Sequence, residues 1–317
     1  MKDGDTWAIT SYYRFDDPGG EKRRLRAYRG FRRHLQLPLA VVELCPDGAF
    51  DLGPGDAELL IQVRGGDILW QKERLLNIAL EALPRHCETV VWTDCDVILT
   101  RKDWAAALRP LLREFLLVQP FHRLHFLPEG ARPEVDPDSR DWHDSAAYRL
   151  RSATIPDYYF RTRGGTGMRL KCATGMIWAA RRATIEKHGF YDRLLLGGGD
   201  KAIFSAACGR YEDFAKSYQM VPRQRADYES WAKSFFKTVA GRIGYLEGDA
   251  LHLWHGDLST RYYSDRYDSF DQFRFDPGTD LIRNAHGVWC WSSDKPELHA
   301  FVRRYFERRQ GCLPVFS

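Results

Sequence analysis

Apolar runs alternate with helically spaced apolar residues along the first hundred positions. Runs that are rich in branched apolar side chains, and therefore predict buried strands, stand at 7–13, 39–44, 59–63 and 90–99. Between them, residues 21–35 and 70–80 place apolar side chains on one face of a helix. A strand, a helix and a second strand in this order form a βαβ unit. The pattern therefore predicts an α/β fold with a mostly parallel, Rossmann-like sheet flanked by helices.

The pattern is less regular after residue 100. It predicts a helix at 104–115, a strand that begins near 115–118, a strand at 172–180 and a short helix at 181–188. Residues 120–166 show no sustained period, and we interpret them as an irregular insertion that acts as a lid or as an acceptor-binding region. We expect a single large domain over residues 1–266. Residues 267–317, which end in a basic helical pattern, form a C-terminal helical extension.

Composition narrows the classes of function. Of the 317 residues, 44% are hydrophobic and 14% are aromatic, which predicts a well-filled core. A net charge of +4 is compatible with an anionic small substrate but too small to indicate nucleic-acid binding. The 7 cysteines are odd in number and widely spaced, which argues against a disulfide framework and for reduced thiols. With no apolar leader and no transmembrane-length run, the expectation is a cytoplasmic protein, free or peripheral to a membrane.

Two carboxylates interrupt the apolar run at 90–99. Asp94 and Asp96 are two positions apart, so on an extended backbone they point the same way. Two like charges side by side raise each other's pKa unless a cation lies between them. Carboxylate oxygens suit Mg²⁺ or Mn²⁺, which keep coordination positions open for phosphate oxygens. The alternative is a strand end whose two Asp face solvent or start a turn.

Three further groups of residues are candidates for chemistry. Lys72 and Arg74 lie in the first turn of the predicted helix at 70–80, where they contact either a bound diphosphate or neighbouring carboxylates. Asp200 follows three glycines that allow a ligand close to the backbone, although the same residue is suited to cap a helix. His252 and His255 stand three positions apart beside Trp254, a spacing compatible with metal binding.

The order of these features resembles GT-A-fold glycosyltransferases of the family-2-like type, especially the β-1,4-galactosyltransferase and chondroitin-polymerase branches. In those enzymes Lys or Arg followed by Leu-Leu-Asn precedes an Asp-x-Asp strand, as residues 72–77 precede residues 94–96 here. A Gly-bearing strand, a Gly-Phe helix end, a Gly-Gly-Glu-Asp-type segment and a metal-binding His follow in the relatives. Their counterparts here are residues 175–178, residues 189–191, residues 197–200 and His255. The resemblance extends from Trp7 to about Arg266.

The resemblance implies a metal-dependent, inverting transfer of a hexosyl or N-acetylhexosaminyl group from a UDP-sugar to a glycan or other hydroxyl acceptor. It implies Mn²⁺ or Mg²⁺ as cofactor and Asp200 as the catalytic base. The implied metal ligands are Asp94, Asp96 and His255, with His252 as the second histidine candidate. The implied nucleotide contacts are Lys72, Arg74, Asn77 and Asp94. The chain departs from the relatives at Gly199, where they carry a Glu that helps to hold acceptor sugars, and at Lys201, where they carry an acidic residue. The acceptor class therefore stays open.

Three alternatives remain at this point. A nucleotidyltransferase would show a Gly-rich, basic loop after its first strand, which residues 10–14 do not match. A catalytically inactive nucleotide-sugar-binding domain would not need the complete set of carboxylates and histidine. A retaining transferase would not need Asp200 as a base. The sequence leaves the donor sugar and the oligomeric state undetermined.

Overall fold

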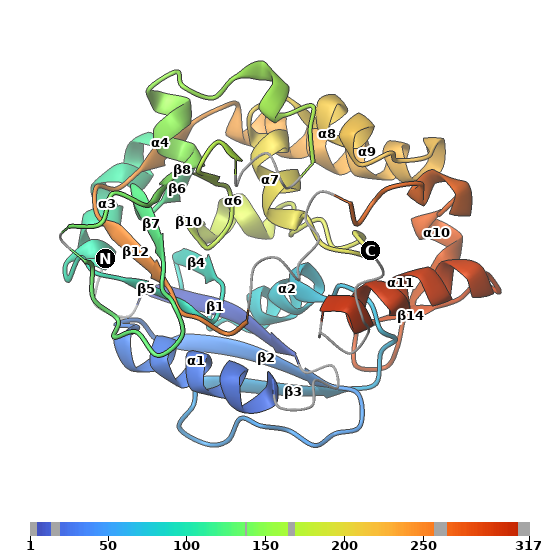
Figure 1. Ribbon diagram of the computed structural model, residues 1–317, viewed down its shortest axis with the longest axis horizontal. Coiled ribbons are helices and arrows are strands. Elements are labelled where there is room, and N and C mark those ends of the chain that lie inside the picture. The colour runs from blue at the N-terminus through green and yellow to red at the C-terminus, as the bar shows by residue number, and fades with distance from the viewer. Residues whose placement is uncertain (1–4, 14–19, 137, 164–168, 257–264, 310–317) are drawn as a thin grey trace.

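A seven-stranded sheet forms the centre of the molecule (Figure 1), seen in a computed structural model that describes residues 5–13, 20–136, 138–163, 169–256 and 265–309. Its strand order is β11-β6-β10-β4-β1-β2-β3. The strands are β1 (Thr6–Tyr13), β2 (Leu39–Cys45), β3 (Leu59–Arg64), β4 (Thr89–Thr93), β6 (Leu117–Gln119), β10 (Ile177–Arg181) and β11 (Ile243–Tyr245). Only β10 is antiparallel to its neighbours. The predicted α/β fold with a mostly parallel sheet is therefore confirmed.

Helices cover both faces of this sheet. One face packs against α1 (Gly20–His34) and α3 (Trp104–Glu114), and the other against α2 (Lys72–Ala82), α6 (Arg182–Glu186) and α7 (Gly199–Ala207). Successive strand residues supply the two faces in turn: Val41 belongs to the core under α1, and Ala40 and Val42 belong to the core under α2. Strands buried on both faces are uniformly apolar, which is why they were readable in the sequence.

A second, five-stranded sheet explains why the predicted strand at 90–99 is wrong. Its strands, in spatial order, are β5 (Val97–Leu99), β12 (Asp249–His252), β7 (Arg123–Phe126), β8 (His143–Ser145) and β9 (Cys172–Ala173). The run at 90–99 is therefore not one strand but β4, a turn at 94–96, and β5 in the other sheet. The Asp94 N–H donates to the Met176 carbonyl, while the Asp96 carbonyl accepts from the Leu253 N–H. Because these two hydrogen bonds go to different segments, the chain passes from one sheet to the other between Asp94 and Asp96.

Segment 120–166 is more regular than the sequence indicated. Besides β7 and β8 it contains α4 (Ala146–Arg151) and the 3₁₀ helix η1 (Asp157–Tyr159). These elements have three to six residues each, too few to show a period in the sequence. The same limitation applies to 172–180, which divides into β9 and β10.

The C-terminal part packs into the main core instead of standing apart. Two helices that the sequence did not indicate, α8 (Tyr211–Ser217) and α9 (Pro222–Val239), lead towards it. It then contains η3 (Phe270–Phe273), α10 (Pro277–Asp280), β13 (Leu281–Arg283), β14 (Trp289–Trp291) and α11 (Pro296–Arg309). The extension is thus a strand pair as well as helices (Figure 1). Val288 and Val302 share one apolar cluster with Ile9 of β1. None of the helices within the described ranges combines the length and the apolar character of a membrane span.

Candidate functional site

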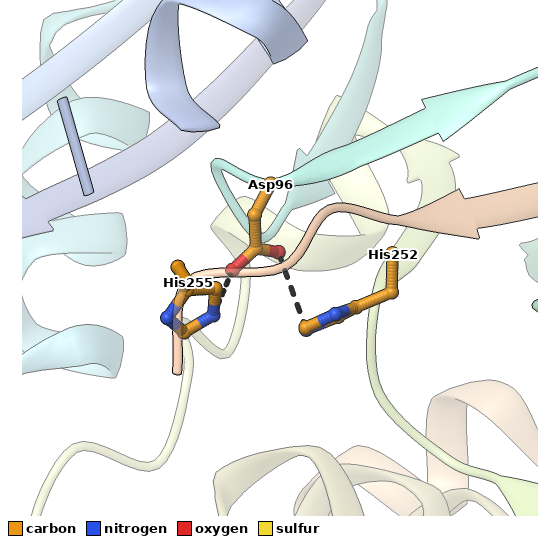
Figure 2. Close-up of side chains that lie close together, drawn as sticks. All are labelled: Asp96, His252 and His255. Carbon is orange, nitrogen blue, oxygen red and sulfur yellow. Dashed lines mark ion pairs between the residues drawn. The ribbon is translucent and has the colours of Figure 1, made fainter. Parts of the chain in front are cut away.

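Three potential metal ligands converge where β5 and β12 pair (Figure 2). His252 ends β12 opposite Val97, which places it beside Asp96 in the preceding turn. The Asp96 Oδ2 lies 2.7 Å from the His255 Nε2, and the Asp96 Oδ1 lies 3.8 Å from the His252 Nε2. One ligand atom from each of the three residues lies within 4.8 Å of the other two. The structure therefore brings both predicted histidines, and one of the two predicted aspartates, to one point.

The chemistry of these donors fits a divalent ion. Asp96 and His252 are buried and His255 is partly exposed, so the cluster is sheltered yet open on one side. A carboxylate with two imidazoles is a mixed oxygen and nitrogen set, not the oxygen-only set expected from the Asp pair alone. Imidazole ligands suit transition metals better than Mg²⁺, whereas Mn²⁺ also accepts carboxylate. The ligand set is therefore compatible with a divalent transition-metal ion.

Asp94 lies outside this cluster and faces Lys72. Its Oδ1 is 2.6 Å from the Lys72 Nζ. The expectation that Asp94 and Asp96 point the same way is wrong because residues 94–96 form a turn, as the alternative reading of the sequence allowed. Burial raises the pKa of Asp94 above its ordinary value, and the Asp200 and Asp96 carboxylates add to the shift while Lys72 opposes it.

Lys72 links Asp94 to Asp200. It is the first residue of α2, and its Nζ lies 2.9 Å from the Asp200 Oδ2 and 3.2 Å from the Asp200 Oδ1. Burial alone would lower the pKa of Lys72, but the Asp200 and Asp94 carboxylates outweigh it and raise that pKa well above its ordinary value. Lys72 therefore remains a fixed positive charge between two carboxylates.

Asp200 is held by this charge and does not cap its helix. The N-cap of α7 is Gly198, with φ 111°, and Asp200 is the second helical residue, so the capping alternative is wrong. The Asp200 side chain is 29% exposed. Its Oδ2 lies so close to Gly175 that a Cβ there would approach it to 2.9 Å. Asp200 thus combines a fixed position with access from solvent.

The three glycines before Asp200 make room for the protein's own side chains. A Cβ on Gly197 would lie 2.9 Å from the Trp70 ring, and a Cβ on Gly198 would lie 2.6 Å from the Tyr218 ring. A Cβ on Gly199 would lie 2.0 Å from the Glu73 Oε1. The expectation that these glycines admit a ligand to the backbone is therefore wrong, because side chains from elsewhere in the fold fill that space.

Arg74 and Asn77 point away from Lys72. The buried Arg74 lies 3.3 Å from Asp192 and 3.4 Å from Glu81. The Asn77 Nδ2 donates to the Phe190 carbonyl at 2.9 Å and to Asp192 at 3.1 Å. Residues two apart on a helix face in different directions, so Lys72 and Arg74 cannot reach the same ligand from one face. Both residues instead attach α2 to segment 190–192.

Two residues of this region were not singled out from the sequence. The Trp70 Nε1 donates to the Glu73 Oε2 at 2.8 Å, and the Tyr13 ring meets the Trp70 ring edge-on at 6.1 Å between centroids. Burial raises the pKa of Glu73 to about 7; Lys72 opposes this shift and the Asp200 carboxylate adds to it. Nothing in the sequence distinguishes Glu73 from an ordinary acidic residue at a helix start.

Lys201, the residue after Asp200, makes a structural contact. Its ammonium group donates to the carbonyls of Tyr159 and Thr162. Burial lowers its pKa to about 8. Lys201 therefore fastens the segment around η1 to α7, next to Asp200.

No family model matches this chain, and no curated protein matches it in sequence. Among solved structures, the chain is similar to a mutant of Drosophila β1,4-galactosyltransferase 7 complexed with manganese, UDP-Gal and xylobiose. The identity is 10% over 94% of this chain and 98% of that chain, with a TM-score of 0.38. Against Mycobacterium tuberculosis glucosyl-3-phosphoglycerate synthase with phosphoglyceric acid, the identity is 14%, the coverage 93% and 91%, and the TM-score 0.36.

A third similar structure is the catalytic domain of the Drosophila β1,4-galactosyltransferase 7 with xylobiose, at 13% identity and a TM-score of 0.29. The match covers 66% of this chain and 62% of that domain, less than two thirds of its length. Two of these three structures are therefore of a galactosyltransferase, and one is of a glucosyl-3-phosphoglycerate synthase. At these identities and TM-scores the activity of this chain has to be inferred from its own residues.

Proposed function

We propose that this protein is a metal-dependent, inverting glycosyltransferase that moves a hexosyl or N-acetylhexosaminyl group from a UDP-sugar to a hydroxyl acceptor. The observation that carries the proposal is that a candidate metal site for the donor and a candidate base for the acceptor are connected. We call them the donor half and the acceptor half of the site. The metal-ligand cluster at Asp96 and the partly exposed carboxylate of Asp200 lie on either side of the Asp94–Lys72 pair. Asp94 and Asp96 follow the carboxyl end of β4, where open α/β sheets bind ligands.

The donor half of the site consists of the metal cluster and Lys72. Asp96, His252 and His255 would hold the ion, which when bound supplies a Lewis acid for the charge of the departing diphosphate. Lys72 adds a positive charge that burial keeps from being screened by solvent. We leave Arg74 and Asn77 out of the donor site because they pair with segment 190–192. The UDP-sugar class rests on the motif resemblance.

Asp200 is the general base of the acceptor half. The acceptor oxygen forms a bond to the anomeric carbon while the bond from that carbon to the diphosphate oxygen breaks, and the electron pair leaves with the diphosphate. The acceptor proton passes to the Asp200 carboxylate. Attack from the side opposite the leaving group inverts the anomeric configuration. Asp200 lies on α7, separate from the metal ligands, which supports its role as the general base.

A nucleotide-sugar-binding domain without turnover is the second candidate. It is favoured by one observation, the Lys72 ammonium group that contacts both oxygens of Asp200. In the transferase the donor diphosphate competes for Lys72, so that both Asp200 oxygens lose the ammonium contact when the donor is bound. We further propose a cytoplasmic location, supported by the thiols of Cys87, Cys95, Cys172, Cys208 and Cys290, which form no disulfide within the described part of the chain.

A donor panel separates the two candidates. Nucleotide sugars incubated with the protein and Mn²⁺ should show hydrolysis of a UDP-sugar, and transfer when hydroxyl acceptors are added. Asp200→Asn should lower the transfer rate by about 10²–10⁴-fold, the usual effect of losing a general base. UDP affinity with Mn²⁺, measured by calorimetry, should survive that substitution.

A product of inverted configuration by NMR would support the transferase. Binding of a UDP-sugar without any turnover would leave the binding domain. Wild-type transfer by Asp200→Asn, or a product of retained configuration, would remove Asp200 from the role of base.

A further inference from the structure

The carboxyl group of Glu73 fills the space that a side chain at residue 199 would occupy. A Cβ on Gly199 would lie 2.0 Å from the Glu73 Oε1, 2.3 Å from its Cδ and 2.7 Å from its Cγ. Gly197 and Gly198 have φ of 83° and 111°, values that favour glycine, whereas Gly199 is the first residue of α7. The neighbouring carboxyl group, not the backbone, therefore requires glycine at 199.

Glu73 makes one of four contacts between residues 70–73 and residues 195–200, the segments in which α2 and α7 begin. The Trp70 N–H donates to the Leu195 carbonyl at 3.1 Å, and the Trp70 ring packs on Gly197. The Lys72 Nζ contacts Asp200, and Glu73 lies against Gly199. These contacts therefore hold residues 70–73 against residues 195–200, and Asp200 is the last residue of the second segment.

Burial of the Glu73 carboxyl group between these segments is energetically unfavourable. Glu73 is 5% exposed and its carboxyl accepts a hydrogen bond from the Trp70 indole. Burying an acidic group costs more than burying an apolar side chain of the same size, so packing alone does not account for it. The cost is understandable if the carboxyl group keeps the Trp70 ring and Asp200 in a fixed relation to each other.

We propose that Glu73 is a positioning residue for the acceptor half of the site. Its carboxyl group, supplied from α2, holds the Trp70 ring and the start of α7 so that the ring and Asp200 form one wall for a polyhydroxyl acceptor. The proposal rests on the proposed transferase function. If the proposal is correct, a carboxyl group at this location should support transfer whether residue 73 or residue 199 carries it.

A transplant of the carboxyl group tests this. Glu73→Ala should lower kcat/KM for the acceptor at least tenfold, while UDP affinity with Mn²⁺ and hydrolysis of the donor by water stay within about twofold of wild type. Glu73→Gln, which keeps the shape and an acceptor for the Trp70 indole, should retain most of the transfer. The double variant Glu73→Ala/Gly199→Glu should recover transfer, and Glu73→Ala/Gly199→Ala should not.

Two controls keep the result interpretable. Glu81→Ala changes an exposed acidic residue of the same helix and should leave transfer unchanged. If Glu73→Ala does not fold, Gly199→Ala in the wild-type background displaces the carboxyl group without removing it, and the same selective loss of transfer is expected.

Several outcomes would overturn the proposal. Wild-type acceptor kinetics of Glu73→Ala, or equal recovery by the two double variants, would do so. A parallel loss of UDP affinity in Glu73→Ala would assign Glu73 to donor binding instead. A wild-type protein that neither binds UDP nor hydrolyses a nucleotide sugar would remove the transferase function itself, a result distinct from failure of the Glu73 variants alone.

Discussion

At the scale of single residues, the partner of each carboxyl group decides its role. Asp94 and Asp96 are neighbours in sequence, yet one faces an ammonium group and the other faces two imidazoles. The Glu73 carboxyl group accepts a hydrogen bond from the Trp70 indole, and burial raises its pKa to about 7. Three acidic residues of the same site therefore differ in their partners and in the chemistry that each can support.

The metal cluster is tested by removing its ligands one at a time. We expect Mn²⁺ binding to weaken by more than about tenfold in each of the variants Asp96→Ala, His252→Ala and His255→Ala. Loss of a residue that only hydrogen-bonds to a metal ligand already lowers metal affinity about tenfold, and these variants lose the ligand itself. Calorimetric titration with Mn²⁺ and Mg²⁺ measures the effect, and Mn²⁺ should bind more tightly to the wild type. His125→Ala, on β7 and paired with Asp249 outside the cluster, is the matched control. Wild-type affinity in His252→Ala would reduce the site to Asp96 and His255.

Glu73 makes stability depend on pH. Its pKa is raised from 4.5 to about 7 in the folded protein, so between these values the folded chain holds a proton that the unfolded chain has released. The free energy of unfolding therefore falls as pH rises from about 4.5 to about 7, by up to about 3 kcal/mol from this group. Urea unfolding at pH 5 and pH 8 should show this fall in the wild type and a smaller fall in Glu73→Gln. Equal pH dependence of the two proteins would show that Glu73 titrates near its ordinary value.

At the scale of elements, α2 has two functions on different faces. Its first residue, Lys72, reaches the candidate site, while Arg74 and Asn77 hold segment 190–192. The Leu-Leu-Asn segment thus anchors the helix, whereas Lys72 is the residue that the helix contributes to the site.

This division predicts different effects of two similar substitutions. Lys72→Ala should weaken UDP binding by about 1–3 kcal/mol, the value of a charge-assisted hydrogen bond. Arg74→Ala removes the ion pair of the largely buried Asp192, which keeps its contact with Asn77, so it should lower the free energy of unfolding by up to about 3–5 kcal/mol while the folded fraction binds UDP normally. Calorimetry with Mn²⁺ and thermal unfolding of both variants distinguish the two effects. Equal loss of UDP affinity in both variants would restore Arg74 to the donor site.

At the scale of the whole molecule, the C-terminal part supports the site from a distance in sequence. The Gln71 Nε2 donates to the Trp289 carbonyl at 2.8 Å, and the Trp289 N–H donates to the Gln71 Oε1 at 3.1 Å. Gln71 is fully buried and directly precedes Lys72. The strand β14 therefore fixes the start of α2, and with it the position of the candidate donor contact.

Removal of residues 267–317 should consequently unfold the protein instead of releasing a separate module. The truncation exposes the apolar cluster that Val288, Trp289 and Val302 share with the central sheet. Circular dichroism and size-exclusion chromatography of the truncated chain measure this, and Gln71→Ala in the full chain is a milder test of the same contact. A folded truncated chain that still binds UDP would show that the extension is dispensable.

The local sequence determined the elements that are long and buried. The strands β1 to β4, the helices α1 to α3 and the mostly parallel sheet follow from apolar runs and helical spacing, because burial on one or both faces imposes those patterns directly. The candidate residues Lys72, Asp94, Asp96, Asp200, His252 and His255 were also identifiable by residue type and order.

Only the tertiary structure decided how these residues are combined. The turn at 94–96 separates two aspartates that the sequence places together, and the pairing of β5 with β12 brings Asp96 to histidines more than 150 positions later. The glycines at 197–199 are explained by Trp70, Tyr218 and Glu73, none of which is near them in the chain. Such contacts depend on the packing of distant segments, and a local pattern of apolar and polar residues contains no information about which distant side chain will fill a given space.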